Sequence, residues 1–494
     1  MNDTETAELQ RLLQEAADAR HDLAAQHPRE RYAQLAMIAA RLDDAADDLV
    51  TLAMAESHLP EARLRGELRR TTMQLRLFAE EAGAGGFIDV RIDRPDPEFG
   101  SGPRPDLRRM KTPIGVVLNF AASNFPFAFS IAGGDTASAL ATGCPVIVKA
   151  HPGHPQLSAL TASIIAEALA DTGAPRGAFA VIYGQDSGTA ALRDDRVDAA
   201  TFTGSVRGGL QLETIARERA RPIPFYGELG SINPVVVTAA AVTARSTEIV
   251  AGFVGSFTLG NGQFCTKPGL LFLPEGHGLD AELAAAAGEV RSGQLLTESI
   301  TTSFRERIRS VTGEVRGVTL LESVDVDGCP QPGLLKVDSD TFLQHAENIL
   351  TEVFGPFSVI VEYAGTDQLL TALAQLEGSL TLSLQAEESD EELVRRLLPA
   401  LQAKAGRVIV NDWPTGVAVT PAQHHGGPYP ATTNSLYTSV GTASVERFLR
   451  PVAFQNFFPA WLPEPLQDEN PWHVPQKINE AEQSQGWGRA TVTS

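Results

Sequence analysis

The chain has 494 residues, of which 43% are hydrophobic and 20% charged, the composition of a folded protein with more than one hydrophobic core. Its formal net charge of −21 opposes nonspecific attachment to phosphate backbones, so nucleic acid is not an expected partner. The acidic, polar N-terminus does not support export, and three widely spaced cysteines offer neither a disulfide framework nor a metal-ligand spacing, so we expect a cytoplasmic protein.

The first part of the chain has helical periodicity. Apolar residues recur at helical spacing from about Glu8 to Ala79, and Pro60 interrupts the pattern once. Between Asp93 and Pro105 prolines and glycines are dense, which excludes regular helix and predicts an extended excursion.

The stretch from Thr112 to Gly134 carries no charged residue and is long enough for a membrane span. Asn119, Asn124 and Pro126 interrupt it, however, so a buried strand, loop and helix fit better, and no membrane partner is expected.

Beyond Lys111 short apolar runs alternate with stretches rich in Ala and Leu, a pattern that predicts parallel strands with crossover helices. The runs before Glu228 are 115–120, 145–149, 178–183 and 198–202, and those after it are 233–237, 268–273, 357–362, 380–384 and 406–410. We therefore predict two α/β halves with a cleft between them. The tail from Pro463 to Ser494 shows little periodicity and is interpreted as a surface extension.

Three polar residues have settings that suit catalysis. Cys265 lies in Asn-Gly-Gln-Phe-Cys-Thr, Glu228 lies upstream in Gly-Glu-Leu-Gly, and Asn124 precedes Phe-Pro. A thiol with a carboxylate base can act as a nucleophile, and a rigidly held amide can stabilise an oxyanion. Taken singly, a cysteine is usually a small buried hydrophobe, the interpretation we give to Cys144 and Cys329. The alternatives for the other two are a solvated Glu228 on a turn and an Asn124 that caps a following helix.

The run Phe202 to Gly209 has an apolar strand meeting glycines just before a helix, where Gly204, Ser205 and Gly209 would let backbone approach a phosphate. The spacing is not that of the usual dinucleotide fingerprint, so a simple strand-to-helix turn remains open.

Several motifs in this order resemble the aldehyde dehydrogenase superfamily. The similarity extends from the N-terminal helices to about Phe458 and is greatest to the branch that oxidises 2-oxoglutarate semialdehyde (2,5-dioxopentanoate). Beside the motif of Cys265, it is carried by Met54–Ser57, Leu59–Leu64, Gly133–Leu140 and His425–Thr432. The resemblance implies an α/β fold with a Rossmann-like cofactor domain, an α/β catalytic domain and a small oligomerisation flap.

The resemblance also implies catalytic roles. Cys265 would attack the aldehyde, Asn124 with the Cys265 backbone N–H would hold the oxyanion, and Glu228 would activate the water that hydrolyses the thioester. A carboxylate at 228 argues against relatives that pass the acyl group to coenzyme A, and no metal is required.

For the cofactor, the resemblance makes the Gly204 to Gly209 turn a nicotinamide dinucleotide site. It places Lys149 at the adenosine ribose, Glu352 at the nicotinamide ribose and Phe354 nearby, while a strand edge and a core aromatic are the plain alternatives for the last two. Many NAD-preferring relatives have a glutamate where this chain has Pro152. Without that carboxylate, Lys149 and His151 could bind a 2′-phosphate, so we predict NADP, with NAD possible.

The predicted domains are a cofactor-binding domain (1–92 and 111–228), a catalytic domain (229–444), an oligomerisation element (93–110 and 445–462) and the extension 463–494. Relatives are dimers or tetramers, so a homodimer or homotetramer is expected. A partner's strand completing a sheet would account for the Pro-rich excursion, for which a surface loop is the alternative.

The substrate is less well defined than the chemistry. A carboxylate-bearing aldehyde needs a cation, and Lys267 is the nearest in sequence to Cys265, although a solvated lysine is the alternative. Residues 416–423 depart from the semialdehyde branch, in which a glutamate is expected at Ala418 and a Cys-His-Ala-Met-like run at 420–423. Two alternatives therefore stay open: the same chemistry on another aliphatic or aromatic aldehyde, and a non-catalytic binding or structural protein on this fold.

Overall fold

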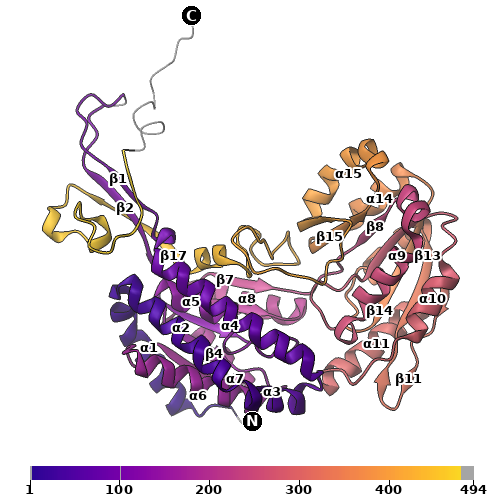
Figure 1. Ribbon diagram of the computed structural model, residues 1–494, viewed down its shortest axis with the longest axis horizontal. Coiled ribbons are helices and arrows are strands. Elements are labelled where there is room, and N and C mark those ends of the chain that lie inside the picture. Colours follow the sequence, from indigo (N-terminus) through magenta and orange to yellow (C-terminus); the bar gives the residue numbers. More distant parts are fainter. Residues whose placement is uncertain (1–2, 101, 480–494) are drawn as a thin grey trace, which may run out of the picture.

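The computed structural model describes residues 3–100 and 102–479, which form two α/β halves and a projecting arm (Figure 1). One sheet has five strands, another has seven, and a third of four strands forms the arm. The predicted α/β class is confirmed. In the described part of the chain no helix is both long and apolar enough to cross a membrane.

Four helices open the chain, as the helical periodicity predicts. They are α1 (Thr6–Ala25), α2 (Pro28–Asp44), α3 (Ala46–Ser57) and α4 (Glu61–Ala84). Pro60 is the N-terminal flanking residue of α4, a place where proline does not break a helix. Leu35 and Leu42 of α2 pack with Leu68 and Leu75 of α4 in the largest buried cluster, which attaches these helices to the first half.

The five-stranded sheet is parallel and has the order β5-β4-β3-β6-β7. Its strands are β3 (Val116–Phe120), β4 (Val146–Lys149), β5 (Phe179–Ile182), β6 (Val197–Thr203) and β7 (Phe225–Glu228), with helices α5 (Gly134–Thr142), α6 (Pro155–Asp171), α7 (Gln185–Arg193) and α8 (Val206–Glu218). The sequence predicts each of these strands except β7. It does not predict β7 because Pro222 and Pro224, which are unfavourable in strands, directly precede it. Glu228 therefore ends a strand and does not lie on a turn.

The seven-stranded sheet has the order β10-β13-β14-β9-β8-β15-β16 and is parallel except for the β10–β13 pair. The strands are β8 (Val235–Val237), β9 (Leu270–Pro274), β10 (Val318–Leu321), β13 (Gly333–Asp338), β14 (Phe357–Tyr363), β15 (Ser379–Gln385) and β16 (Ala405–Val410). The helices are α9 (Ala239–Thr258), α10 (Asp280–Glu289), α11 (Glu298–Glu314), α12 (Ser339–Gln344), α13 (Ala346–Ile349), α14 (Thr366–Gln375) and α15 (Glu391–Lys404), and β11 (Asp325–Val326) pairs with β12 (Cys329–Pro330). The sequence analysis did not predict β10 and β13.

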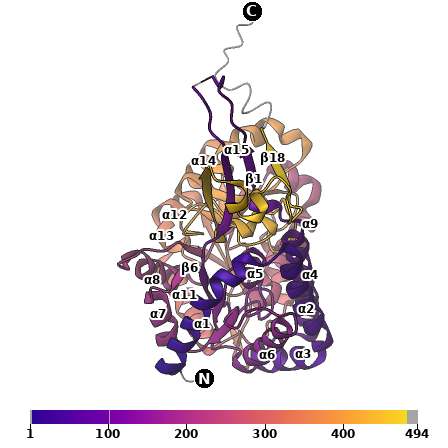
Figure 2. The ribbon, with the colours of Figure 1, turned by 90° about the vertical axis from the view of Figure 1, so that its left-hand side faces the viewer.

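The arm is a sheet of β17 (Leu449–Gln455), β2 (Leu107–Pro113), β1 (Val90–Asp93) and β18 (Gln476–Ile478), in that order. Figure 1 shows the arm standing away from both halves, and in Figure 2, seen from the side of the arm, β1 and β18 lie towards the viewer. Its last strand corrects the interpretation of residues 463–494 as a surface extension, because β18 pairs with β1 and both Leu466 and Val474 are buried. The rest of that extension, 480–494, lies outside the described residues.

The segment after β16 returns from the seven-stranded half to the other half. The Leu229 N–H donates to the carbonyl oxygen of Ala431 at 2.8 Å, and Arg447 forms an ion pair with Asp135 of α5 at 2.7 Å. The returning segment thus contacts the first half, and the predicted domain boundary at residue 444 stays a prediction. Short 3₁₀ helices are η1 (Gly86–Ile88), η2 (Leu259–Gly262), η3 (Glu388–Asp390), η4 (Thr442–Phe448), η5 (Pro459–Trp461) and η6 (Glu464–Leu466).

Candidate active site

A cavity of about 1050 Å³ lies where the two halves meet. Its walls include Asn124 and Lys149, which follow or end strands of the parallel sheet, together with Glu228 and residues of α11. Cys265 reaches it from the seven-stranded half. Ligands of open parallel sheets bind at the carboxyl ends of their strands, so the cavity is in the expected place.

Cys265 follows a tight loop at the end of α9 and η2. Gly262 has φ +68° there, and an added Cβ would lie 2.2 Å from the carbonyl carbon of Gly355, so only glycine allows the two loops to approach. The amide of Asn233 donates to the Cys265 carbonyl oxygen at 2.7 Å. The thiol is thus fixed at the cavity wall and half-buried, whereas Cys144 is buried in the core and Cys329 is half-exposed.

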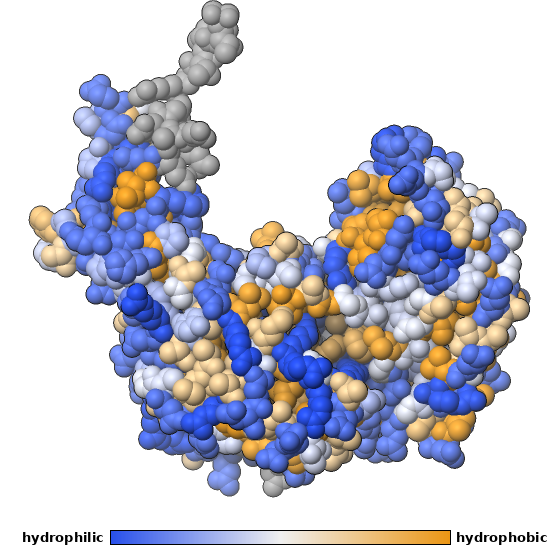
Figure 3. Space-filling view, in the orientation of Figure 1, coloured by the Kyte–Doolittle hydropathy of each residue, from blue (hydrophilic) through white to orange (hydrophobic). Residues whose placement is uncertain are grey.

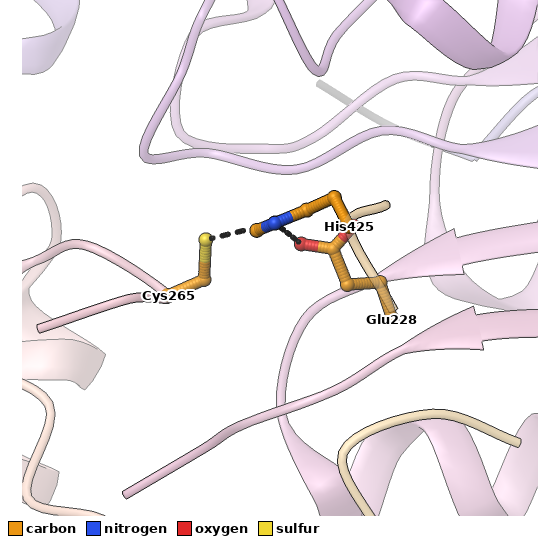
Figure 4. A group of neighbouring side chains, drawn as sticks. All are labelled: Glu228, Cys265 and His425. Atoms are coloured by element: carbon orange, nitrogen blue, oxygen red, sulfur yellow. Dashed lines mark hydrogen bonds and ion pairs between the residues drawn. The ribbon is translucent and has the colours of Figure 1, made fainter. Parts of the chain in front are cut away.

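Cys265, His425 and Glu228 form a connected group (Figure 4). The thiol sulfur lies 3.7 Å from His425 Nε2, and the same nitrogen lies 2.9 Å from Glu228 Oε1. The hydroxyl of Ser439 donates to the other carboxylate oxygen of Glu228. Glu228 is therefore a buried, fully oriented carboxylate, which contradicts the alternative of a solvated charge.

The electrostatics of this group favour a protonated thiol beside an ionised base. Burial raises the pKa of the Cys265 thiol well above its ordinary value, and the carboxylates of Glu228 and Glu352 raise it further. Burial opposes ionisation of Glu228 as well, but His425 and the Ser439 hydroxyl outweigh it and hold the pKa of Glu228 below its ordinary value. Because a thiolate is the nucleophilic form, the thiol must lose its proton before it attacks.

The three donor atoms of this group lie within 4.8 Å of one another, close enough to hold a metal ion. His425 Nε2, which would bind such an ion, is already engaged by Glu228. The hydrogen bonds account for the spacing of the three donor atoms.

Asn124 lies at the wall of the same cavity. Its amide donates one N–H to the carbonyl oxygen of Gln263 at 3.1 Å, which leaves the second N–H for another acceptor. No helix begins after it until Gly134, so the helix-capping alternative is wrong. No group among the described residues accepts a hydrogen bond from the backbone N–H of Cys265.

The predicted cofactor residues are mostly brought together. Lys149, His151, Gly204, Ser205, Glu352 and Phe354 all line the cavity. Ser205 caps α8, where its hydroxyl accepts from the Gly208 N–H at 3.2 Å. Gly209 instead lies against Leu229 and Phe202, away from the cavity lining. A helix N-terminus with glycines facing a cavity of this size fits a dinucleotide phosphate.

His151 does not supply the cation that the sequence analysis expects. Burial, and then His154 and Lys149, lower the pKa of His151 to about 3, so its imidazole is neutral near pH 7. Its Nδ1 accepts from the backbone N–H of Gly153 at 3.0 Å.

Lys267 does not serve the substrate either. It is fully buried, and its ammonium donates to the carbonyl oxygens of Val353 and Phe357, both at 2.8 Å. Lys267 is therefore neither a cation for the substrate nor a solvated lysine. Its two hydrogen bonds attach the loop of Cys265 to Val353 and to Phe357, the first residue of β14.

Three residues near the thiol were not assigned by sequence reasoning: His425, Ser439 and Arg70. The motif His425–Thr432 was noticed, but nothing in its spacing showed that it returns to Cys265 across 160 residues. Arg70 of α4 stacks on the ring of Phe129 at 5.5 Å from the ring centroid, and that ring lies 6.5 Å from the ring of His425.

A thiol, a buried carboxylate and an amide donor at one end of a dinucleotide-sized cavity, on a fold of two α/β halves, are typical of dehydrogenases that work through a cysteine. The profile of the aldehyde dehydrogenase family matches residues 1–448, and the chain belongs to this family. The family oxidises aldehydes with NAD(P).

Two similar relatives are alpha-ketoglutaric semialdehyde dehydrogenases. One, alpha-ketoglutaric semialdehyde dehydrogenase 2 of Azospirillum brasilense, is 46% identical over 479 residues, 95% of this chain and 91% of that protein. The other, from Acinetobacter baylyi, is 41% identical over 447 residues, 90% of this chain and 85% of that protein.

Solved structures share the fold. Lactaldehyde dehydrogenase of Escherichia coli superimposes with a TM-score of 0.78 at 21% identity and covers 92% of each chain. Aldehyde dehydrogenase 21 of Physcomitrella patens, in complex with the reaction product succinate, gives a TM-score of 0.77 at 22% identity, with 92% of this chain and 91% of that one covered. The aldehyde dehydrogenase fold is thus confirmed.

Proposed function

We propose that the chain oxidises 2-oxoglutarate semialdehyde to 2-oxoglutarate through a covalent bond to Cys265. The observation that carries the chemistry is the hydrogen-bonded group of Cys265, His425 and Glu228 at the cavity wall. The relatives from Azospirillum brasilense and Acinetobacter baylyi support the substrate.

In the first half of the reaction, Cys265 sulfur bonds to the aldehyde carbon and the thiol proton is lost to solvent in the cavity, because His425 Nε2 already carries the hydrogen that it donates to Glu228. The carbonyl oxygen becomes an oxyanion, and the free N–H of Asn124 and the Cys265 backbone N–H are its donors. Lys149, Ser205 and Glu352 line the cavity and would hold the dinucleotide, which would supply the hydride acceptor needed to oxidise the Cys265 adduct to a thioester.

In the second half, Glu228 takes a proton from water, the hydroxide adds to the thioester carbon, and the carbon–sulfur bond breaks to release the acid and the thiolate. Hydrogen bonds from Ser439 and His425 keep this carboxylate ionised and aimed. Such orientation is the protein's main contribution to the rate of hydrolysis.

The substrate carboxylate needs a cation, and Arg70 supplies one. Its guanidinium has no hydrogen-bond or ion-pair partner among the described residues, and it stacks on Phe129 beside His425. Burial lowers the pKa of Arg70, while the charges of Glu67, Cys265 and Glu228 favour its cationic form. Guanidinium groups match carboxylates in geometry, so a free one next to the thiol favours an acidic aldehyde.

Replacing Arg70 with glutamine is expected to raise KM for 2-oxoglutarate semialdehyde by roughly 10- to 100-fold, the usual loss for a hydrogen bond to a charged group. KM for pentanal, which has no carboxylate, should change by less than about twofold. Initial rates with both aldehydes measure this. Arg69→Gln, an exposed neighbour on α4, is the matched control, and an equal effect on both aldehydes would contradict the assignment.

The same chemistry on an uncharged aldehyde is the second candidate, because residues 416–423 depart from the semialdehyde branch. An aldehyde panel followed by reduced-nicotinamide formation separates the two: preference for the carboxylate-bearing semialdehyde supports the first, and preference for apolar aldehydes the second. A purely structural role does not account for the orientation of Cys265, His425 and Glu228.

The prediction of NADP as preferred cofactor is supported by Lys149 at the cavity wall and by Pro152 in place of a carboxylate. The neutral imidazole of His151 removes one part of that argument. A reducing compartment such as the cytoplasm suits three cysteines that are all free thiols.

The arm supports the proposal of a homo-oligomer. Its edge strand β17 is largely exposed, and Phe458 and Trp461 are 64% and 69% exposed beside it. Figure 3 shows the molecular outline hollowed between the arm and the seven-stranded half, where a second copy could lie.

Light scattering during size-exclusion chromatography should therefore give the mass of two or four chains. Removing both aromatic side chains, Phe458→Ser with Trp461→Ser, should shift the mass towards one chain, whereas Leu436→Ser, which is 83% exposed away from the arm sheet, should not. A monomer in the unmodified protein would contradict the proposal.

A further inference from the structure

The residues Asp3 and Thr4 are held against the cofactor half by four hydrogen bonds. Thr4 N–H donates to Tyr183 O at 3.0 Å, and Tyr183 N–H donates to Thr4 Oγ1 at 2.8 Å. In the first turn of α7, the Ser187 N–H donates to Asp3 Oδ1 at 3.0 Å and the Ser187 hydroxyl donates to Thr4 O at 2.9 Å. Asp3 and Thr4 therefore have fixed positions.

Gly184 makes this approach possible. It has φ +90°, and an added Cβ would lie 1.9 Å from Asp3 Oδ1. Any larger residue would displace the Asp3 carboxylate from α7.

Asp3 and Lys149 face the same part of the cavity. Both line it, together with Tyr183 and Gly184. The Lys149 stem lies against Gly188, where an added Cβ would come within 3.0 Å of Lys149 Cγ, and Gly188 follows the residue that binds Asp3. The charge of Asp3 acts on Lys149, offsetting in part the lowering of the Lys149 pKa by burial. Among the described residues no donor bonds the second oxygen of Asp3, Oδ2.

We propose that Asp3 discriminates the 2′-hydroxyl of NAD from the 2′-phosphate of NADP. Dinucleotide-binding folds commonly use an acidic residue to accept from the ribose 2′-hydroxyl, and a 2′-phosphate beside such a carboxylate is repelled. Pro152, in the loop after β4, leaves no carboxylate at its own position to repel a 2′-phosphate, but Asp3 is a second place from which a carboxylate can act. Asp3 places a carboxylate at the part of the cavity that Lys149 lines, so its negative charge offsets the positive charge of Lys149 there. This inference rests on the use of NAD(P) and not on the identity of the aldehyde.

The test measures the dissociation constants of NADP and NAD for the full chain by titration calorimetry. No aldehyde is present, and any purification tag is placed at the C-terminus. Asp3→Asn keeps an oxygen for the Ser187 N–H and removes the charge. It should tighten NADP about tenfold relative to NAD, and the gain should shrink as salt is raised.

Asp186→Asn is the matched control, since Asp186 is an exposed acid in the same turn of α7 that does not line the cavity. The inference is overturned if the ratio of the two dissociation constants stays within twofold in Asp3→Asn, or if Asp186→Asn changes it equally. Adenosine 2′,5′-bisphosphate and 5′-AMP, used as competitors, should show the same shift, because they differ only at the 2′ position. If no aldehyde is oxidised in the rate assay, the proposed substrate is wrong, but the effect of Asp3→Asn on dinucleotide binding still stands.

Discussion

Replacing Cys265 with alanine is expected to lower kcat by at least about 10⁴-fold, because no other group can form the covalent bond to the aldehyde. The sulfur is the one nucleophile that the cavity wall places beside His425 and near Asn124 within the described residues. Reduced-nicotinamide formation with 2-oxoglutarate semialdehyde measures the loss.

The matched control is Cys329→Ala, which removes a half-exposed thiol from the β12 strand and should leave kcat unchanged. Dinucleotide affinity and the midpoint of thermal unfolding should be retained in Cys265→Ala, since the side chain is small and half-buried. More than about one hundredth of the original kcat in Cys265→Ala would rule out Cys265 as the nucleophile.

Replacing Glu228 with glutamine is expected to separate the two halves of the reaction. Glutamine keeps the shape but not the basicity, so thioester should form once and then hydrolyse about 10³-fold more slowly. Rapid mixing should show a burst of one reduced nicotinamide per Cys265, followed by a very slow steady rate, and mass spectrometry should find the acyl adduct on Cys265.

Ser439→Ala provides the comparison, because it removes one hydrogen bond to Glu228 and retains the carboxylate. Its steady rate should fall by no more than about tenfold, without an accumulated adduct. Absence of a burst in Glu228→Gln, with a loss as large as in Cys265→Ala, would assign Glu228 to activation of the thiol and not to hydrolysis.

The sequence was most informative where a pattern is local. Strands such as β3 and β4 are short apolar runs between breakers, and Cys265, Glu228 and Asn124 each lie in a recognisable motif. Strand β7 was missed because prolines precede it, and β18 because its three residues gain order only by pairing with β1. The tertiary fold, and not the local sequence, decides which strand pairs with another and which charges lie near a given side chain.

The errors at the site have the same origin. Lys267 can be buried because the carbonyl oxygens of Val353 and of Phe357 at the start of β14 accept from its ammonium, and the imidazole of His151 is neutral because of the packing around it. His425 approaches the thiol only because the chain returns from β16, and Arg70 only because α4 packs against α5. No spacing in the sequence encodes these approaches.

The return of the chain after β16 also bears on the order of folding. His425 lies 160 residues beyond Cys265 and 197 beyond Glu228, so the catalytic group joins segments of very high sequence separation. Contacts of this kind form late, because a large loop must close before they are made. A chain in which both sheets have formed therefore still lacks the complete catalytic group until the segment after β16 has settled between the halves.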